Sequence, residues 1–181
     1  MNPAFLLVAA VASGVLLLTI QLFRYWLRWR GTRVVTCPEN QRKVGVEVDA
    51  RHAAFTGLYT GPALRLSSCT RWPERQGCGQ ACLSEIAQAG QGCLVRTLLS
   101  RWYEAKDCAY CGKPIGEIDW GARKPALLTP GGTTIDWAQV NAEHLDEVLA
   151  THRPVCFACH VTNTFARAHP ELLVDRSARN T

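Results

Sequence analysis

Cys108-Ala-Tyr-Cys111-Gly112 and Cys156-Phe-Ala-Cys159-His160 are the two segments that decide how the C-terminal half of this chain folds. Two cysteines separated by two residues can close on one ion from a single tight turn. Two such turns supply the four thiolates that a structural Zn2+ ion prefers. We therefore predict one tetrahedral Zn2+ site, with the ligands Cys108, Cys111, Cys156 and Cys159.

The elements expected around these cysteines have a characteristic order. A turn follows the first pair, two β-prone pieces at 118–120 and 134–137 flank a Pro-Gly-Gly turn, and helices are predicted over 141–150 and 162–173. A knuckle, a hairpin and a last cysteine pair entering a helix resemble the treble-clef zinc finger. The resemblance covers about residues 107–173 and includes one extra short helix before the last pair.

His160 allows a second interpretation, because Cys-x-x-Cys-His is also the attachment sequence of a c-type haem. Such a haem would be held by Cys156, Cys159 and His160, and it would need a second axial ligand, usually His or Met. The one methionine is Met1, and the haem would leave the first Cys-x-x-Cys pair without a role. The pattern favours Zn2+, with His160 beside the site or, in a variant, replacing one thiolate.

Five further cysteines come earlier in the chain, and two of them, Cys78 and Cys82, are spaced to lie on one face of a helical turn. We predict that this group binds a second Zn2+ or an iron–sulfur cluster, although its spacing is not that of a ferredoxin. Buried apolar thiols and redox-active thiols are the alternatives. The predicted ligands are Cys37, Cys69, Cys78 and Cys82, with Cys93 as the alternative to Cys37.

Residues 4–23 form an uncharged and largely apolar run. A helix rises about 1.5 Å per residue, so a run of about 20 residues matches the roughly 30 Å core of a bilayer. A cleaved signal peptide has basic residues before a shorter apolar run, whereas Met1-Asn2-Pro3 has no basic side chain. We predict an uncleaved transmembrane anchor.

The segment 24–43 carries the charge of the molecule. Glu39 is the one acidic residue in this segment, so its basic residues give it a formal charge of +5. The rest of the chain has equal numbers of basic and acidic residues, so the whole net charge of +5 lies next to the apolar run. The positive-inside rule then places the N-terminus outside and the body in the cytoplasm. We expect an aromatic belt at the headgroups, arginines on anionic lipid and, since no basic excess remains beyond residue 43, no nucleic-acid binding. The belt residues are Phe23, Tyr25, Trp26 and Trp29.

Cytoplasmic placement affects how the cysteines are interpreted. Thiols stay reduced in that compartment, so clustered cysteines are expected to be metal ligands rather than disulfides. The odd total of nine cysteines also argues against a fully paired disulfide framework. A body outside the cytoplasm would instead favour the haem and disulfide interpretations.

The predicted fold class is α+β, with a single N-terminal transmembrane helix followed by a small cysteine-rich body that ends in a treble-clef-like finger. Alternating valines over 44–48 indicate a half-buried strand, 63–67 is a second strand candidate, and helical periodicity covers parts of 52–58 and 83–103. The predicted segments are an anchor (1–23), a basic juxtamembrane segment (24–43), a cysteine-containing α+β section (44–106), the zinc-binding module (107–175) and a flexible tail (176–181).

Catalytic motifs are scarce: the sequence has no phosphate-binding loop, no Gly-x-Ser-x-Gly and no His-Glu-x-x-His. Residues 68–82 and 102–114 resemble segments of uncharacterised bacterial membrane-anchored cysteine-rich proteins, which implies the inner membrane and no particular activity. We predict a non-enzymatic, membrane-tethered zinc protein that acts as an accessory or docking subunit for a protein partner. An electron-transfer protein and a thiol-based metal sensor or handler are the alternatives.

Overall fold

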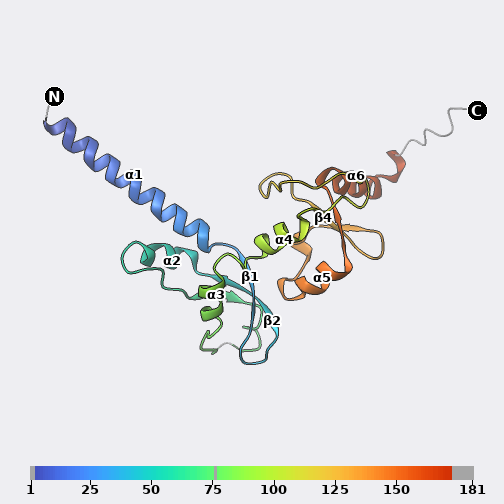
Figure 1. Ribbon diagram of the computed structural model, residues 1–181, viewed down its shortest axis with the longest axis horizontal. Helices are drawn as coiled ribbons and strands as arrows, with labels where there is room; N and C mark the ends of the chain where they lie inside the picture. The colour runs from blue at the N-terminus through green and yellow to red at the C-terminus, as the bar shows by residue number, and fades with distance from the viewer. Residues whose placement is uncertain (1–2, 76, 173–181) are drawn as a thin grey trace, which may run out of the picture. The chain divides into compact units, whose positions relative to one another are not determined.

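The computed structural model describes residues 3–75 and 77–172 and confirms an α+β fold (Figure 1). The chain divides into two units, Met1–Thr97 and Leu98–Thr181, which are described in turn. The finer segment limits expected from the sequence stay predictions, and the expected tail at 176–181 lies outside the described residues.

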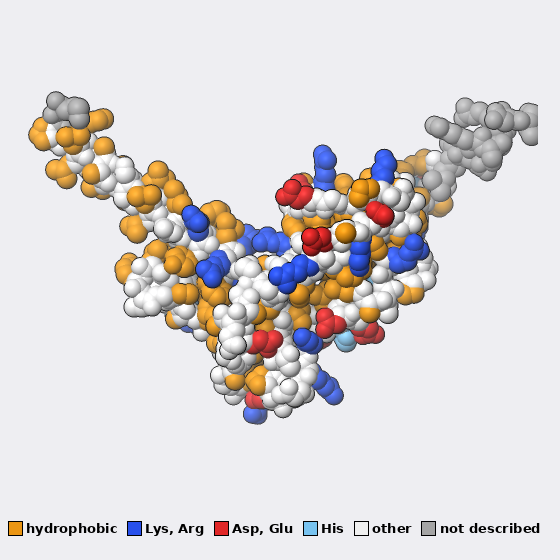
Figure 2. All heavy atoms as spheres, viewed as in Figure 1, with side chains coloured by type: hydrophobic (Ala, Val, Ile, Leu, Met, Phe, Trp, Pro, Cys, Tyr) orange, Lys and Arg blue, Asp and Glu red, His pale blue; other side chains and the backbone are white. Residues whose placement is uncertain are grey.

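Helix α1 (Pro3–Trp29) begins the first unit. Its apolar side chains are exposed along most of its length, as Figure 2 shows; Phe5, for example, is 69% exposed and Leu17 63%. Within the described part of the chain, this is the one helix long and apolar enough to cross a membrane. Such a helix at the N-terminal end is compatible with a membrane anchor or a signal sequence.

The end of α1 belongs to the core of the first unit. Trp29 is only 4% exposed and Arg33, four residues on, is fully buried. The Arg33 guanidinium donates hydrogen bonds to the backbone oxygens of Trp29 (2.7 Å), Arg28 (2.9 Å) and Gly31 (3.1 Å), three carbonyls at the end of the helix. Two residues expected at the lipid headgroups, Trp29 in the belt and Arg33 among the arginines, therefore stabilise the fold instead.

A three-stranded antiparallel sheet of order β1-β2-β3 forms the centre of the first unit. The alternating valines predicted a strand at 44–48, and β2 confirms it. A helix in the region of 52–58 is confirmed by α2, which Asp49 caps by accepting a hydrogen bond from the His52 N–H. The elements are β1 (Thr32–Thr36), β2 (Lys43–Val48), α2 (Ala50–Gly57), β3 (Leu66–Cys69) and α3 (Leu83–Ala89).

The core of this unit lies between the sheet and the helices. Trp29 packs with valines of β1 and β2, with Ala53 of α2 and with Ile86 of α3. Two cysteines, Cys82 and Cys93, are buried in the same cluster. Burial of these side chains is the main term that holds α1, the sheet and the two short helices together.

The second unit has a small antiparallel sheet of order β5-β4-β6, so its last strand returns beside its first. Tyr103, at the end of α4, is buried, and its hydroxyl donates to the Ala126 oxygen of β4 at 2.7 Å. Helix α6 follows β6 directly. The elements are α4 (Val95–Tyr103), β4 (Ala126–Leu128), β5 (Thr134–Ile135), η1 (Trp137–Gln139), η2 (Ala142–His144), α5 (Leu145–Thr151), β6 (Arg153–Val155), α6 (Phe157–Ala168) and η3 (Pro170–Leu172).

The first strand of the predicted hairpin was placed wrongly. The strand lies at Ala126–Leu128, and Asp119 instead begins a turn in which its carboxylate accepts from the N–H groups of Gly121 and Ala122. A short polar side chain that can bond its own backbone favours a turn over a strand. Of the partner strand expected at 134–137, residues 134–135 are confirmed, whereas Trp137 begins the 3-10 helix η1.

Candidate metal centre

The first cysteine pair lies on a tight turn. The Gly112 N–H donates to the Cys108 oxygen (2.9 Å), and the Cys108 N–H donates to the Lys113 oxygen (2.8 Å). Gly112 has φ of +66°, a conformation that a residue without a Cβ adopts at no steric cost. This turn is the predicted knuckle.

The second pair lies at the start of α6. Cys156 is the N-cap residue of the helix, and Cys159 is in its first turn. Two hydrogen bonds join this region to the knuckle: the Ala109 N–H donates to the Pro154 oxygen (2.8 Å), and the Cys156 N–H donates to the Cys108 sulfur (3.3 Å). Because β6 is fixed in the sheet by β4, the helix start is held against the knuckle.

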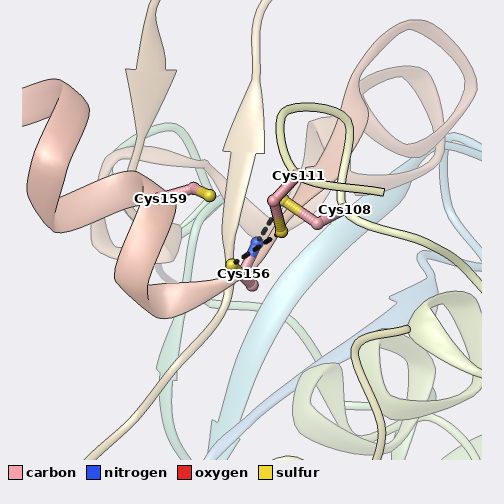
Figure 3. A group of neighbouring side chains, drawn as sticks. All are labelled: Cys108, Cys111, Cys156 and Cys159. Carbon is pink, nitrogen blue, oxygen red and sulfur yellow. Dashed lines mark hydrogen bonds between the residues drawn. The ribbon is translucent and has the colours of Figure 1, made fainter. Parts of the chain in front are cut away.

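All four sulfurs converge, as Figure 3 shows for the knuckle and the helix that carry them. They lie within 4.8 Å of one another, and Cys111 Sγ is 3.9 Å from Cys156 Sγ. Four sulfurs at about 2.3 Å from a central Zn2+ would lie roughly 3.8 Å apart. The described residues therefore contain a four-cysteine group that can hold a metal ion such as Zn2+.

The four thiols have different proton affinities. Burial raises the pKa of Cys108, but hydrogen bonds from the N–H groups of Cys156, Cys111 and Tyr110 outweigh it and lower this pKa to about 6. Burial and then the neighbouring thiols raise the pKa of Cys159 to about 12. One thiolate thus forms readily, and each further negative charge is opposed by those already present unless a cation enters.

His160 is not part of the group of four converging ligands. Its Nδ1 lies 2.9 Å from the Thr134 hydroxyl of β5, and Thr134 in turn donates to Asn163 of α6 (3.2 Å). The ring therefore ties α6 to the hairpin. The convergence of the four thiols without His160 favours four thiolates over three thiolates plus His160.

The five cysteines considered as ligands of a second metal site all belong to the first unit, and their sulfurs do not converge as closely as those of the C-terminal four. Of all the groups in the described part of the chain, the C-terminal four alone have ligand atoms within 4.8 Å of one another. Cys82 is the N-cap of α3 and Cys78 precedes it in a loop, so the expected helical turn joining the two is wrong. A contact that the sequence did not suggest is the hydrogen bond from Arg71 Nη1 to Cys37 Sγ (2.7 Å).

The fold and the site together define an α+β protein with a long apolar N-terminal helix and a C-terminal four-cysteine centre. Comparisons with protein-family models, with curated proteins and with solved structures found no match.

Proposed function

We propose that this chain is a membrane-anchored, cytoplasmic zinc protein, whose treble-clef-like second unit is folded around Zn2+ bound by Cys108, Cys111, Cys156 and Cys159. The observation that carries the proposal is the convergence of two distant cysteine pairs within 4.8 Å. The second unit has only a small sheet, and a metal cross-link between its knuckle and its last helix supplies stability that a small core does not.

An uncleaved anchor is supported by the packing at the end of α1. Trp29 lies six residues beyond the apolar run and is buried in the core of the first unit, so α1 continues from the apolar run into the folded body. Tyr25 is also packed closely against α2, because a Cβ on Gly57 would lie 3.1 Å from its ring. The helix is thus part of the folded first unit.

A cytoplasmic body is supported by the arginines at the end of α1. Arg24, Arg28 and Arg30 are all exposed there. Gln21, Tyr25 and two of these arginines line a hollow of about 390 Å³. Cations placed directly after a span favour the inner side of the membrane and attract anionic headgroups.

An accessory role with a protein partner is supported by one face of α6. Phe157, Val161 and Phe165 are 40%, 47% and 51% exposed and are spaced four residues apart, so they lie on one side of the helix. A row of exposed apolar side chains on a soluble unit is typical of a contact surface for another protein. A photo-crosslinker at Val161, with Glu147 as the matched exposed control, tests this: a defined adduct at 161 that Phe165→Glu abolishes is expected, and equal labelling at both positions would refute it.

The zinc proposal is tested on the full chain in detergent, purified under reducing, anaerobic conditions. We expect bound Zn2+ by elemental analysis, and we expect Cys108→Ser/Cys111→Ser to lose one Zn2+ per chain together with the fold of the second unit. A variant that stays folded and loses only exchangeable metal would show that the metal is not structural. A visible haem or iron–sulfur spectrum lost in the same variant would replace zinc by electron transfer.

The topology is tested separately with C-terminal reporter fusions in a bacterial host. A fluorescent protein should be active and alkaline phosphatase inactive, because the first folds in the cytoplasm and the second needs an oxidising compartment. Replacing Arg24, Arg28 and Arg30 by Glu should weaken this preference. The opposite reporter pattern in the unaltered chain would disprove a cytoplasmic body.

A further inference from the structure

The turn at Cys37 repeats the backbone of the knuckle at Cys108. The Gln41 N–H donates to the Cys37 oxygen (2.8 Å), and the Cys37 N–H donates to the Arg42 oxygen (2.8 Å). These bonds join residues at the same spacings as in the knuckle, where Gly112 and Lys113 take the places of Gln41 and Arg42.

The match extends to the strained position. Gln41 has φ of +57°, in the left-handed region that Gly112 also occupies. A residue with a side chain is strained there, so the turn is held by its surroundings.

A second cysteine in this unit also has a counterpart in the zinc module. Cys82 is the N-cap of α3, as Cys156 is of α6. In each unit, therefore, one cysteine lies in a knuckle-like turn and another lies at the start of a helix. The difference is that Asn40 occupies the position of the second knuckle cysteine, so the remaining ligands have to come from elsewhere.

Two further cysteines approach Cys82. Cys69 ends β3, where it pairs with Val46 in the middle of the sheet, and Cys78 lies in the loop before α3. Cys82 is buried in the core of the first unit, and Cys37 and Cys69 pack against the same core. These thiols therefore gather around one cluster of buried side chains, although their sulfurs are not at the spacing of the C-terminal four.

We infer that the first unit holds a second Zn2+ ion, bound by Cys37 of this cysteine–asparagine knuckle, by Cys69 and Cys78, and by Cys82 at the start of α3. Coordination at about 2.3 Å draws the four sulfurs together. The site lies outside the zinc module and its ligands come from different elements, so it is independent of the function proposed above.

Arg71 gives this site an outer partner. Its Nη1 lies 2.7 Å from the Cys37 sulfur and 3.2 Å from Glu39. Four thiolates around one Zn2+ carry a net charge of −2, and a guanidinium donating to one sulfur offsets part of it. Glu39, which also contacts Arg75 at 3.5 Å, holds the arginine in place from the other side.

Cys93 is not part of the site. It lies in the same core, but its sulfur is 3.6 Å from the Gly90 oxygen, and its charged neighbours are Arg33 and Glu85. A thiol is the weak donor in such a contact. Cys93 is therefore a buried apolar thiol and serves as the control for the ligands.

The test measures Zn2+ per chain in the full-length protein, by elemental analysis, and counts thiolate sites by titrating the metal-free protein with Co2+ under reducing, anaerobic conditions. We expect two Zn2+ per chain and two Co2+ equivalents with thiolate charge-transfer absorption. Cys69→Ser/Cys82→Ser should lose one of the two, Cys108→Ser/Cys111→Ser should lose the other, and Cys93→Ala should keep both.

Saturation of the unaltered protein at one equivalent that only Cys108→Ser/Cys111→Ser removes would overturn the inference and leave the zinc module intact. Loss of an equivalent in Cys93→Ala, but not in Cys37→Ser, would overturn the ligand set. Iron and sulfide in place of the second zinc would overturn the choice of metal.

A gain-of-ligand variant tests the knuckle itself. Because Asn40 stands where the zinc module has Cys111, Asn40→Cys should restore the second Co2+ equivalent to a Cys78→Ser protein. The matched change Asn40→Ser should not. No recovery with cysteine would show that the Cys37 turn does not present residue 40 to a metal.

Discussion

Cys111 Sγ and Cys156 Sγ lie 3.9 Å apart, although the two residues are 45 positions apart in the sequence. The contact joins a tight turn to the N-terminus of a helix, and β6 places that helix by pairing with β4. The small sheet therefore brings the two cysteine pairs together. A metal ion bound by the four cysteines would in turn stabilise the sheet.

Loss of Cys108 is expected to destabilise the second unit more than loss of Cys111. Cys108 is 2% exposed and accepts a hydrogen bond from the Cys156 N–H, whereas Cys111 is exposed. An N–H left without a partner costs about 1 kcal/mol. Cys108→Ala should therefore lower the free energy of unfolding of the second unit by about 1 kcal/mol more than Cys111→Ala, measured by urea unfolding; equal losses would contradict this.

Trp29 should behave as a core residue despite its place at the end of an apolar helix. Trp29→Ala removes a buried side chain from the first unit and should cost about 3–5 kcal/mol. Phe23→Ala, on the same helix but 55% exposed, should leave the thermal stability of that unit unchanged. Differential scanning calorimetry of both variants in the same detergent checks the pair, and similar melting temperatures would refute the assignment.

Arg33 should be needed for the fold rather than for lipid contact. Arg33→Met leaves the Trp29 and Gly31 carbonyls without a donor, whereas Gln91 still donates to that of Arg28, and the loss should cost about 2 kcal/mol. The exposed neighbour Arg30 is the control, since Arg30→Gln should change stability by less than about 0.5 kcal/mol. Chemical unfolding gives both values, and an unaffected Arg33→Met protein would exclude the capping role.

Asp49 should make the first unit sensitive to acid. The hydrogen bond from the His52 N–H and then the Arg65 guanidinium hold the pKa of Asp49 below its ordinary value. The carboxylate therefore contributes stability at neutral pH, and this contribution is lost as the pH falls through the lowered pKa. Asp49→Ala should cost about 1 kcal/mol at pH 7 and progressively less below about pH 4.

The matched variant Asp49→Asn separates the two contacts. Asparagine caps helices about as well as aspartate, whereas it cannot pair with Arg65, and an exposed ion pair contributes only a few tenths of a kcal/mol. Its loss should therefore be well below that of the alanine variant in the same unfolding series. Equal losses at pH 7 would mean that the ion pair, not the cap, is the stabilising contact.

Chelation should remove the fold of the second unit. The proposed Zn2+ would join two turns that are far apart in the chain, so its removal would take away binding free energy that is also folding free energy. Near-ultraviolet circular dichroism after treatment with a strong chelator should lose the signal of the second unit's buried aromatic residues, such as Tyr103. Re-addition of Zn2+ should restore it, and an unchanged spectrum would contradict a structural metal.

Local patterns allowed the sequence to predict much of this protein. The spacing within Cys-x-x-Cys restricts each pair to one turn, the apolar run at 4–23 has no other way to satisfy its side chains than burial or lipid, and alternating valines identify β2. Each of these signals acts over a few residues, so no knowledge of the fold is needed to read it.

Only the tertiary structure decided which residues meet across the chain. The sequence cannot distinguish Arg33, which is buried against the end of α1, from the exposed arginines around it, because all are alike in type and lie in one basic segment. It also cannot show that Cys37-Pro38-Glu39-Asn40 folds like a Cys-x-x-Cys knuckle. That turn is fixed by backbone hydrogen bonds, which any residue type can make, and by the strands on either side of it.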